Sequence, residues 1–291
     1  MDHLMMHQTG IAVTMACNLK CKLCSNYAPY YACPPHESPE HFREMMKRYF
    51  TIVTHVRKLM VTGGEPFLHP HLDEFIQEIR QYKNQLDIFG VITNGGIIPS
   101  DNLLQAAKDF GEPFHVLIDD YGSEHSPNVP AVVERLKAYD IPYIWRHYSG
   151  QDAHCGGWVD FGDLTQKKCE TQQQAEALYA KCAYPQKLHF AFDLVDGVMY
   201  PCGPSRRCQE LGIAGDASEY IDLFDDTLSV EQQREKVAAI YERKTLSACF
   251  YCNGMHEDSS RFEPADQLTA EELALVRSGA RLYAEVQNRK A

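Results

Sequence analysis

The chain has 291 residues, a hydrophobic content of 44% and a formal net charge of −12. This length suits one large domain, or one domain with a smaller companion. The negative charge argues against a nucleic-acid partner, and no apolar run is long enough to cross a membrane. Because the N-terminus lacks an export signal, we expect a cytoplasmic protein whose 11 cysteines are reduced or bind metal.

Strands and helices alternate along the first half of the chain. Apolar runs predict strands at residues 11–16, 58–62, 88–93, 115–119 and 143–147. Helices are predicted between these strands at residues 38–56, 72–79, 101–110 and 129–139. Such alternation implies a parallel sheet with right-handed crossovers. The number of units favours an α/β fold with a partial (β/α)6 TIM-type barrel, which we place at residues 1–164.

Three cysteines directly follow the first predicted strand. Cys17, Cys21 and Cys24 have C-x3-C-x2-C spacing on a loop at the C-terminal end of that strand. Cysteine thiolates hold iron–sulfur clusters, usually four to a cubane, so three thiols leave one iron open for a substrate or cofactor. A zinc knuckle is the alternative, although zinc sites favour paired C-x2-C units that close a tetrahedron.

The octet that begins at Cys17 resembles the signature of the radical S-adenosylmethionine (radical SAM) enzymes. The resemblance implies that the open iron is chelated by the amino and carboxylate groups of S-adenosylmethionine (AdoMet). It also implies that one electron from a [4Fe–4S] cluster releases a 5′-deoxyadenosyl radical. The position before the third cysteine, which contacts adenine in this family, is usually aromatic and is Leu23 here.

A glycine-rich motif follows the second predicted strand. Gly63, Gly64 and Glu65 resemble the family motif that binds the methionine end of AdoMet, although such a stretch alone is also a common turn. The two glycines allow a close backbone approach. Glu65 is predicted to accept hydrogen bonds from the amino group of the cofactor.

Polar residues also stand at the ends of the later strands, where α/β barrels carry their chemistry. Thr93 and Asn94 are predicted to contact the ribose of the cofactor, with a plain strand-to-helix turn as the alternative. Asp119 is predicted to contact the cofactor or act in catalysis. Arg146 is predicted to be catalytic, although an arginine at a strand end is more often a surface or ion-pair residue.

A second cysteine group occupies the predicted domain at residues 165–262. Residues 166–180 and 230–243 favour helices, and residues 188–194 and 198–200 favour a hairpin with its turn at Asp196-Gly197. Residues 263–291 form the remainder, with one amphipathic helix predicted at residues 269–289. Four thiols belong to the second group: Cys182, Cys202, Cys249 and Cys252.

This arrangement resembles the twitch module, a shortened SPASM domain that binds an auxiliary [4Fe–4S] cluster in some radical SAM enzymes. The resemblance therefore implies two clusters and AdoMet as cofactors. A structural zinc bound by the four thiols is the alternative.

The chain further resembles aminocyclitol dehydrogenases and aminoglycoside epimerases, which implies hydrogen abstraction from a carbinol carbon of a sugar or aminocyclitol. An aromatic residue such as Trp158 beside a carboxylate suits such a ring, although a core position explains Trp158 nearly as well. We predict oxidation, with epimerisation as the alternative. An epimerase needs a thiol that returns a hydrogen atom, for which Cys208 is the first candidate and Cys169 the second.

A peptide-modifying radical SAM enzyme is the further alternative. The few residues before the first predicted strand leave no room for a peptide-recognition domain, which disfavours it. The predicted partners are the small-molecule substrate and a flavodoxin or ferredoxin as reductant, with no nucleic acid and no membrane.

Overall fold

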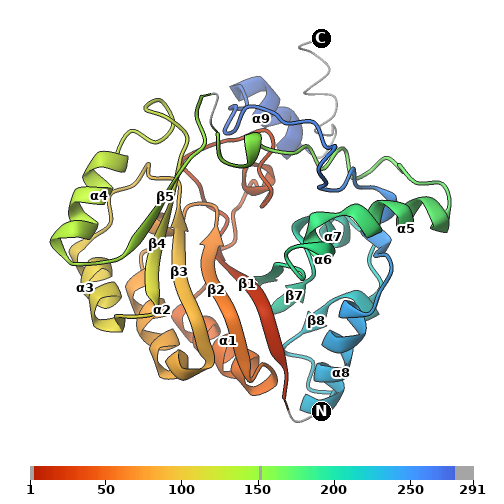
Figure 1. The fold of residues 1–291 in the computed structure, drawn as a ribbon, viewed down its shortest axis with the longest axis horizontal. Coiled ribbons are helices and arrows are strands. Elements are labelled where there is room, and N and C mark those ends of the chain that lie inside the picture. Colours follow the sequence, from red (N-terminus) through yellow and green to blue (C-terminus); the bar gives the residue numbers. More distant parts are fainter. Residues whose placement is uncertain (1–2, 151–152, 279–291) are drawn as a thin grey trace.

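The computed structural model describes residues 3–150 and 153–278, which form one eight-stranded sheet in the order β5-β4-β3-β2-β1-β6-β7-β8. Neighbouring strands from β5 across to β6 run parallel, whereas β6, β7 and β8 are antiparallel to one another. The two ends of the sheet do not meet, so it is open (Figure 1). The strands are β1 (Met5–Thr14), β2 (His55–Gly63), β3 (Leu86–Thr93), β4 (Phe114–Asp120), β5 (Tyr143–His147), β6 (Phe192–Val195), β7 (Val198–Tyr200) and β8 (Ile221–Asp222).

Helices follow the first strands and pack against the sheet. They are α1 (Pro39–Ile52), α2 (Leu72–Ile79), α3 (Asp101–Phe110) and α4 (Val129–Ala138). Helix α1 starts as predicted, because the Ser38 side chain accepts a hydrogen bond from the His41 backbone N–H. It ends before the predicted residue 56, since His55 already pairs with Met5 in the sheet. These helices and strands share one apolar core, in which the buried rings of Phe42 and Phe75 stack 4.1 Å apart.

The predicted α/β fold with a partial barrel is confirmed, and the sheet is open. Strand β6, which the sequence predicts as the first strand of the hairpin in the second domain, joins this same sheet. Strand β6 does not extend the sheet beyond β5 and instead pairs with β1, from Thr9 opposite Phe192 to Ile11 opposite Leu194. Strand β5 remains an edge strand, on which Ile144 is 51% exposed. The sheet therefore contains strands from both predicted domains.

The remaining helices lie mostly beside β6, β7 and β8, on the other side of β1 from the first four helices (Figure 1). They are α5 (Gln172–Lys181), α6 (Ala183–Gln186), α7 (Gly203–Glu210), α8 (Val230–Tyr241) and α9 (Ala270–Arg277). The predicted C-terminal helix at residues 269–289 is thus present up to Arg277, and its last part lies outside the described residues. Within the described ranges, every helix is too short or too polar to span a membrane.

The hairpin in the second half forms where the sequence predicts it. Asp196 and Gly197 have φ angles of +49° and +78°, the left-handed conformation that a two-residue hairpin turn of this kind requires. A Cβ atom on Gly197 would lie 2.4 Å from the Phe224 ring, so glycine is also required sterically. Strand β6, the first strand of this hairpin, is shorter than predicted. His189 and Phe190 adopt positive φ angles, which are incompatible with an extended strand.

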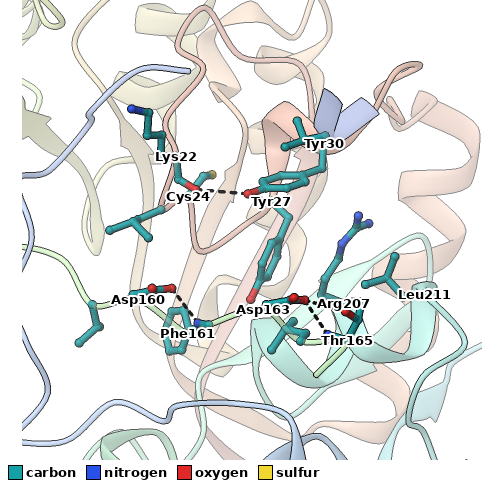
Figure 2. Close-up of a pocket in the computed structure, with 15 residues that line it drawn as sticks. Lys22, Cys24, Tyr27, Tyr30, Asp160, Phe161, Asp163, Thr165, Arg207 and Leu211 are labelled. Carbon is teal, nitrogen blue, oxygen red and sulfur yellow. Dashed lines mark hydrogen bonds between the residues drawn. The ribbon is translucent and has the colours of Figure 1, made fainter. Parts of the chain in front are cut away.

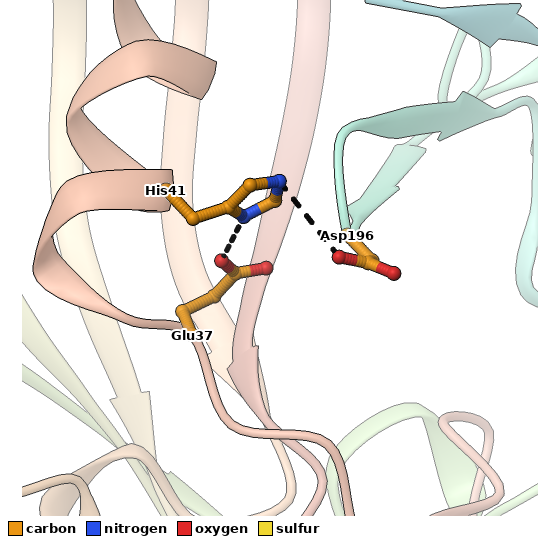
Figure 3. Close-up of side chains that lie close together, drawn as sticks. All are labelled: Glu37, His41 and Asp196. Carbon is orange, nitrogen blue, oxygen red and sulfur yellow. Dashed lines mark hydrogen bonds and ion pairs between the residues drawn. The ribbon is translucent and has the colours of Figure 1, made fainter. Parts of the chain in front are cut away.

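A polar bridge ties this turn to the start of α1 (Figure 3). His41 Nδ1 lies 2.6 Å from a Glu37 carboxylate oxygen, and His41 Nε2 lies 3.9 Å from an Asp196 oxygen. The two carboxylates face opposite nitrogens of one imidazole ring. This geometry suits a carboxylate–imidazole–carboxylate bridge better than a cation shared by all three groups.

Candidate active site

The first cysteine set opens onto a cavity of about 280 Å³ at the carboxyl ends of the parallel strands. The structure brings together here most residues that the sequence predicts for this site. Those that line the cavity are Cys17, Cys21, Cys24, Gly63, Gly64, Thr93, Asn94, Asp119 and Arg146. This edge of the sheet carries the chemistry in α/β barrels.

N–H groups surround two of the three sulfur atoms. The Leu19 backbone N–H lies 3.4 Å from Cys17 Sγ, and Asn94 Nδ2 lies 3.7 Å from the same sulfur. Gln267 Nε2 donates to Cys21 Sγ at 3.2 Å. Burial raises the pKa of the Cys17 thiol to about 12, so metal coordination is what would keep it deprotonated. Donors of this kind stabilise thiolate ligands and tune cluster potentials.

The C-terminal segment covers the cysteine loop, a feature that local sequence signals did not predict. Cys21 and Gln267 form an antiparallel bridge, and the Lys20 backbone N–H donates to Gln267 Oε1 at 2.6 Å. The buried Lys22 ammonium lies 3.1 Å from Asp266 and 3.7 Å from Glu272, the latter on α9. Residues more than 240 positions apart therefore fix the loop that presents the sulfurs.

The two glycines after β2 are required by the end of β1. Gly63 has a φ angle of +132°, and a Cβ there would lie 2.1 Å from the Thr14 carbonyl oxygen. A Cβ on Gly64 would lie 2.2 Å from the Ala16 oxygen. The glycines thus let this turn pack directly under the cysteine loop. Both also line the cavity, so their predicted contact with AdoMet stays a prediction.

Glu65 does not line the cavity, and its predicted role as an acceptor for the cofactor stays a prediction. Its side chain is fully buried, and its oxygens accept hydrogen bonds from the Phe67 N–H at 3.0 Å, Thr93 Oγ1 at 2.9 Å and the Asn94 N–H at 2.7 Å. Burial raises the pKa of this carboxyl to about 7, although these three donors oppose the shift. Glu65 therefore positions Thr93 and Asn94, which do line the cavity.

Asp119 and Arg146 form a two-point ion pair on the cavity wall. They are direct neighbours on β4 and β5, and Arg146 Nε and Nη2 donate to the two carboxylate oxygens at 2.6 and 2.7 Å. Burial raises the pKa of Asp119 to about 6, against the opposing effects of Arg146 and Lys58. Arg146 is thus an ion-pair residue, as the sequence left open, and the pair lines the cavity.

Three aromatic rings complete this side of the cavity. Tyr121 lies 5.4 Å from both Tyr148 and Trp158, measured between ring centroids. The Arg146 guanidinium carbon lies 5.5 Å from the centre of the Tyr148 ring. The lining of the cavity therefore combines flat apolar rings with one carboxylate and one guanidinium.

A smaller cavity of about 90 Å³ is also lined by Cys24 (Figure 2). Leu23 lines this smaller cavity and not the one lined by the glycine turn and Asn94, and its predicted adenine contact stays a prediction. The buried Tyr27 hydroxyl and Asp163 Oδ2 on its wall have no hydrogen-bond partner among the described residues. Burial raises the pKa of Cys24, and the Arg206 guanidinium is among the groups that oppose this shift.

The four thiols of the second group converge as predicted. All four line one apolar cavity of about 30 Å³, although they come from the end of α5, the start of α7 and the segment after α8. Gly254 N–H donates to Cys252 Sγ at 3.2 Å, and burial raises the pKa of Cys249 to about 11. The thiols are Cys182, Cys202, Cys249 and Cys252.

The spacing of these sulfur atoms exceeds that of a zinc site. Tetrahedral zinc, with Zn–S bonds of about 2.3 Å, holds its sulfurs within about 4 Å of one another. In the described part of the chain, no three cysteine sulfurs lie within 4.8 Å of one another. The wider separation fits ligands that surround a group larger than a single ion.

The predicted hydrogen donors, Cys208 and Cys169, do not line the cavity of about 280 Å³ at the first cysteine set, which is called the large cavity below. Cys208 is fully buried and packs with Phe161 and Cys252 on the side of the second cysteine group. Cys169 is anchored by its backbone N–H to the Phe250 carbonyl. Because neither residue lines the cavity, neither thiol is placed to return a hydrogen atom to a substrate held there.

The fold and the site together suit an iron–sulfur enzyme whose cluster would be held by three cysteines at the carboxyl edge of a parallel α/β sheet. Residues 11–142 match the family model described as the Radical SAM superfamily. Over these residues, which are less than half of the chain, the protein is similar to radical SAM enzymes, and that family implies a [4Fe–4S] cluster and AdoMet as cofactors. The cavity fits them, because it joins three thiols to the glycine turn.

Relatives with assigned names match only part of the chain. The GTP 3′,8-cyclase of Sulfurovum sp. (strain NBC37-1) is 33% identical over 102 residues, which are 35% of this chain and 30% of that protein. The GTP 3′,8-cyclase of Nautilia profundicola is 34% identical over 86 residues, which are 29% of this chain and 26% of that protein. The chain therefore matches less than a third of either relative's length.

One solved structure matches nearly the whole chain. The crystal structure of BtrN in complex with AdoMet and 2-DOIA superposes with a TM-score of 0.56 over 90% of this chain and 99% of BtrN. The sequence identity is 14%, so the comparison establishes a shared fold.

Proposed function

We propose that this radical SAM enzyme oxidises a hydroxyl-bearing carbon of a small polyhydroxylated molecule, such as a sugar or aminocyclitol, to a ketone. The observation that carries the proposal is the second set of four converging thiols next to the first site. Oxidation of a carbinol to a ketone removes one hydrogen atom, one proton and one electron. When bound, the first cluster with AdoMet supplies the radical that takes the hydrogen atom, and a second cluster supplies an electron acceptor.

Asp119 is suited to receive the proton. With a pKa of about 6 it is mostly ionised at neutral pH, and its two-point contact with Arg146 fixes its orientation in the cavity. Each carboxylate oxygen keeps a second lone pair for a substrate hydroxyl. Arg146 holds the carboxylate in place and offers positive charge near the oxygen of the reacting carbon.

The aromatic wall supports a ring-shaped polyol as the substrate. Tyr121, Tyr148 and Trp158 present flat apolar surfaces, on which the C–H faces of such a ring can stack. The carboxylate beside these rings accepts O–H groups at the ring edge. The BtrN complex with AdoMet and 2-DOIA is consistent with a small-molecule substrate in this fold.

The charges around the cavity argue against GTP, the substrate in the name of the relatives that match part of the chain. GTP carries three phosphate groups, which proteins bind with arginine, lysine or a metal ion. Of the described residues that line the large cavity, Arg146 alone is cationic, and Asp119 engages it at two points. An adjoining cavity that shares Tyr121 is lined by three carboxylates: Glu124, Glu263 and Asp266.

Epimerisation is disfavoured by the position of the thiols. The cysteines that line the large cavity are those of the first cluster site, and both predicted donors lie elsewhere. We further propose that the second site holds a [4Fe–4S] cluster and not zinc, because no three of its sulfurs lie within 4.8 Å of one another among the described residues. A flavodoxin or ferredoxin is the proposed reductant.

The test combines metal analysis with product analysis. After anaerobic reconstitution, we expect about eight irons per chain, as two cubanes require. The enzyme is then reduced with dithionite and incubated in deuterium oxide with AdoMet and a panel of sugars, aminocyclitols and GTP. We expect 5′-deoxyadenosine together with a ketone product. A stereoisomer with one deuterium, or turnover of GTP alone, would refute the proposed reaction.

A further inference from the structure

The two cysteine sites adjoin at a close contact of the backbone. Gly203, directly after Cys202, packs so closely on Ser25, directly after Cys24, that a Cβ on Gly203 would lie 2.7 Å from the Ser25 carbonyl oxygen. This contact places the start of α7 against the first cysteine loop. Whatever fixes α7 therefore also fixes the two sites relative to each other.

The guanidinium of Arg206, on the first turns of α7, is fully buried at this junction. Its backbone N–H donates to the Cys202 carbonyl, and its Nη2 donates to the Asn26 carbonyl at 3.0 Å. Nη1 contacts the Tyr31 hydroxyl at 2.6 Å. One side chain thus binds the segment after the first cysteine set and belongs to the helix that follows Cys202.

Two carboxylates balance this buried charge. Arg206 Nε donates to Asp193 Oδ2 on β6 at 2.6 Å, and Nη1 donates to Glu210 Oε1 at 2.7 Å. Asp193 is 7% exposed, and Glu210 also accepts hydrogen bonds from Arg207 and the Tyr31 hydroxyl. The positive end of the Arg206–Asp193 pair therefore faces the first cysteine loop, and its negative end lies on the hairpin strand.

We propose that Arg206 is a positioning residue for both sites, which holds α7 against the first cysteine loop and raises the reduction potential of the first cluster. A reduced cluster carries one more negative charge than its oxidised form. A fixed positive charge in a buried junction stabilises that reduced form. The proposal rests on the proposed function only in assuming clusters at these sites.

The experiment uses the reconstituted enzyme and four variants. D193N keeps the shape of the pair and leaves the arginine charge less compensated. R206M/D193N removes both charges together, and R206K keeps a cation without the planar fork. The control is R43M/E78Q, which removes an ion pair between α1 and α2 whose arginine is 60% exposed. The readout is the midpoint potential of the first cluster from redox titrations followed by electron paramagnetic resonance.

We expect D193N to shift this potential to more positive values and R206M/D193N to shift it to more negative values than in the wild type. R206K and the control should stay close to the wild type. A purely structural role would not produce shifts of opposite sign. Equal potentials in D193N and R206M/D193N would overturn the proposal. If R206M/D193N does not take up iron, the D193N variant decides by itself. An unchanged potential of the first cluster in D193N would then overturn the proposal.

The same samples separate this proposal from the proposed function. Iron analysis that finds only about four irons per chain would refute the second cluster. The potential of the first cluster would still be measured in that case, and it would still test the charge of Arg206.

Discussion

Replacement of Glu65 by glutamine tests how the buried carboxylate supports the cofactor cavity. Burial raises the pKa of Glu65 from 4.5 to about 7, so the folded chain binds a proton at a pH where the unfolded chain has released it. Folding stability must therefore fall as the pH rises from 4.5 to above 7. One pKa unit corresponds to about 1.4 kcal/mol, so this shift amounts to about 3 kcal/mol.

The side-chain amide of the E65Q variant cannot titrate, so the variant should lack this loss. Its amide oxygen can still accept from Phe67 and Thr93, but the amide nitrogen then faces the Asn94 N–H, which costs about 1–3 kcal/mol at every pH. We expect E65Q to be less stable than the wild type at pH 5. Between pH 5 and pH 8, the difference in the free energy of unfolding between wild type and E65Q should change by about 3 kcal/mol in favour of E65Q. At pH 8 this difference should therefore be smaller or have the opposite sign.

Urea unfolding of the metal-free chain at several pH values measures this difference. E134Q on the surface of α4 is the matched control, and infrared difference spectra between wild type and E65Q report the protonated carboxyl directly. A wild type that gains stability over E65Q as the pH rises would refute the reasoning. That result would mean that the three donors outweigh burial. Because Asn94 lines the cavity, E65Q should also weaken AdoMet binding.

Three further predictions concern the chemistry. Alanine at all three cysteines of the first set should leave about four irons per chain, and zinc instead of these irons would contradict a second cluster. C208A and C169A should still form the product, since neither thiol reaches the cavity; loss of turnover with intact clusters would restore epimerisation as the reaction. Turnover should rise with pH through about 6 as Asp119 ionises, whereas D119N should lose this rise in the pH–rate profile.

Local signals in the sequence predicted the elements and the ligands that depend on neighbouring residues. The cap at Ser38, the turn at Asp196-Gly197 and the helix at residues 101–110 follow from local backbone preferences, and all three are present. The convergence of the four late thiols was also predicted, because the resemblance to the twitch module supplied contacts that spacing alone does not give.

The functions assigned to single side chains depended on contacts that the sequence does not encode locally. Glu65 stands beside two glycines at a strand end, yet its carboxylate points to Thr93 and Asn94 and away from the cavity. Nothing near Cys21 in the chain indicates that Gln267 donates to its sulfur. Arg206 was not singled out, because a buried arginine is recognisable only when its distant partners are known.

The place of β6 has the largest consequence for the proposed chemistry. Had β6 followed β5 in the sheet, five strand spacings of about 4.8 Å, or roughly 24 Å, would separate it from β1. In the observed order only one such spacing of about 5 Å separates them, and the hairpin returns to Cys202 beside the first cysteine loop. In the proposed reaction, an electron that leaves a substrate radical near the first site would reach the second site across a single close junction. The pairing of β6 with β1 therefore supports the proposed transfer of an electron to the second group of thiols.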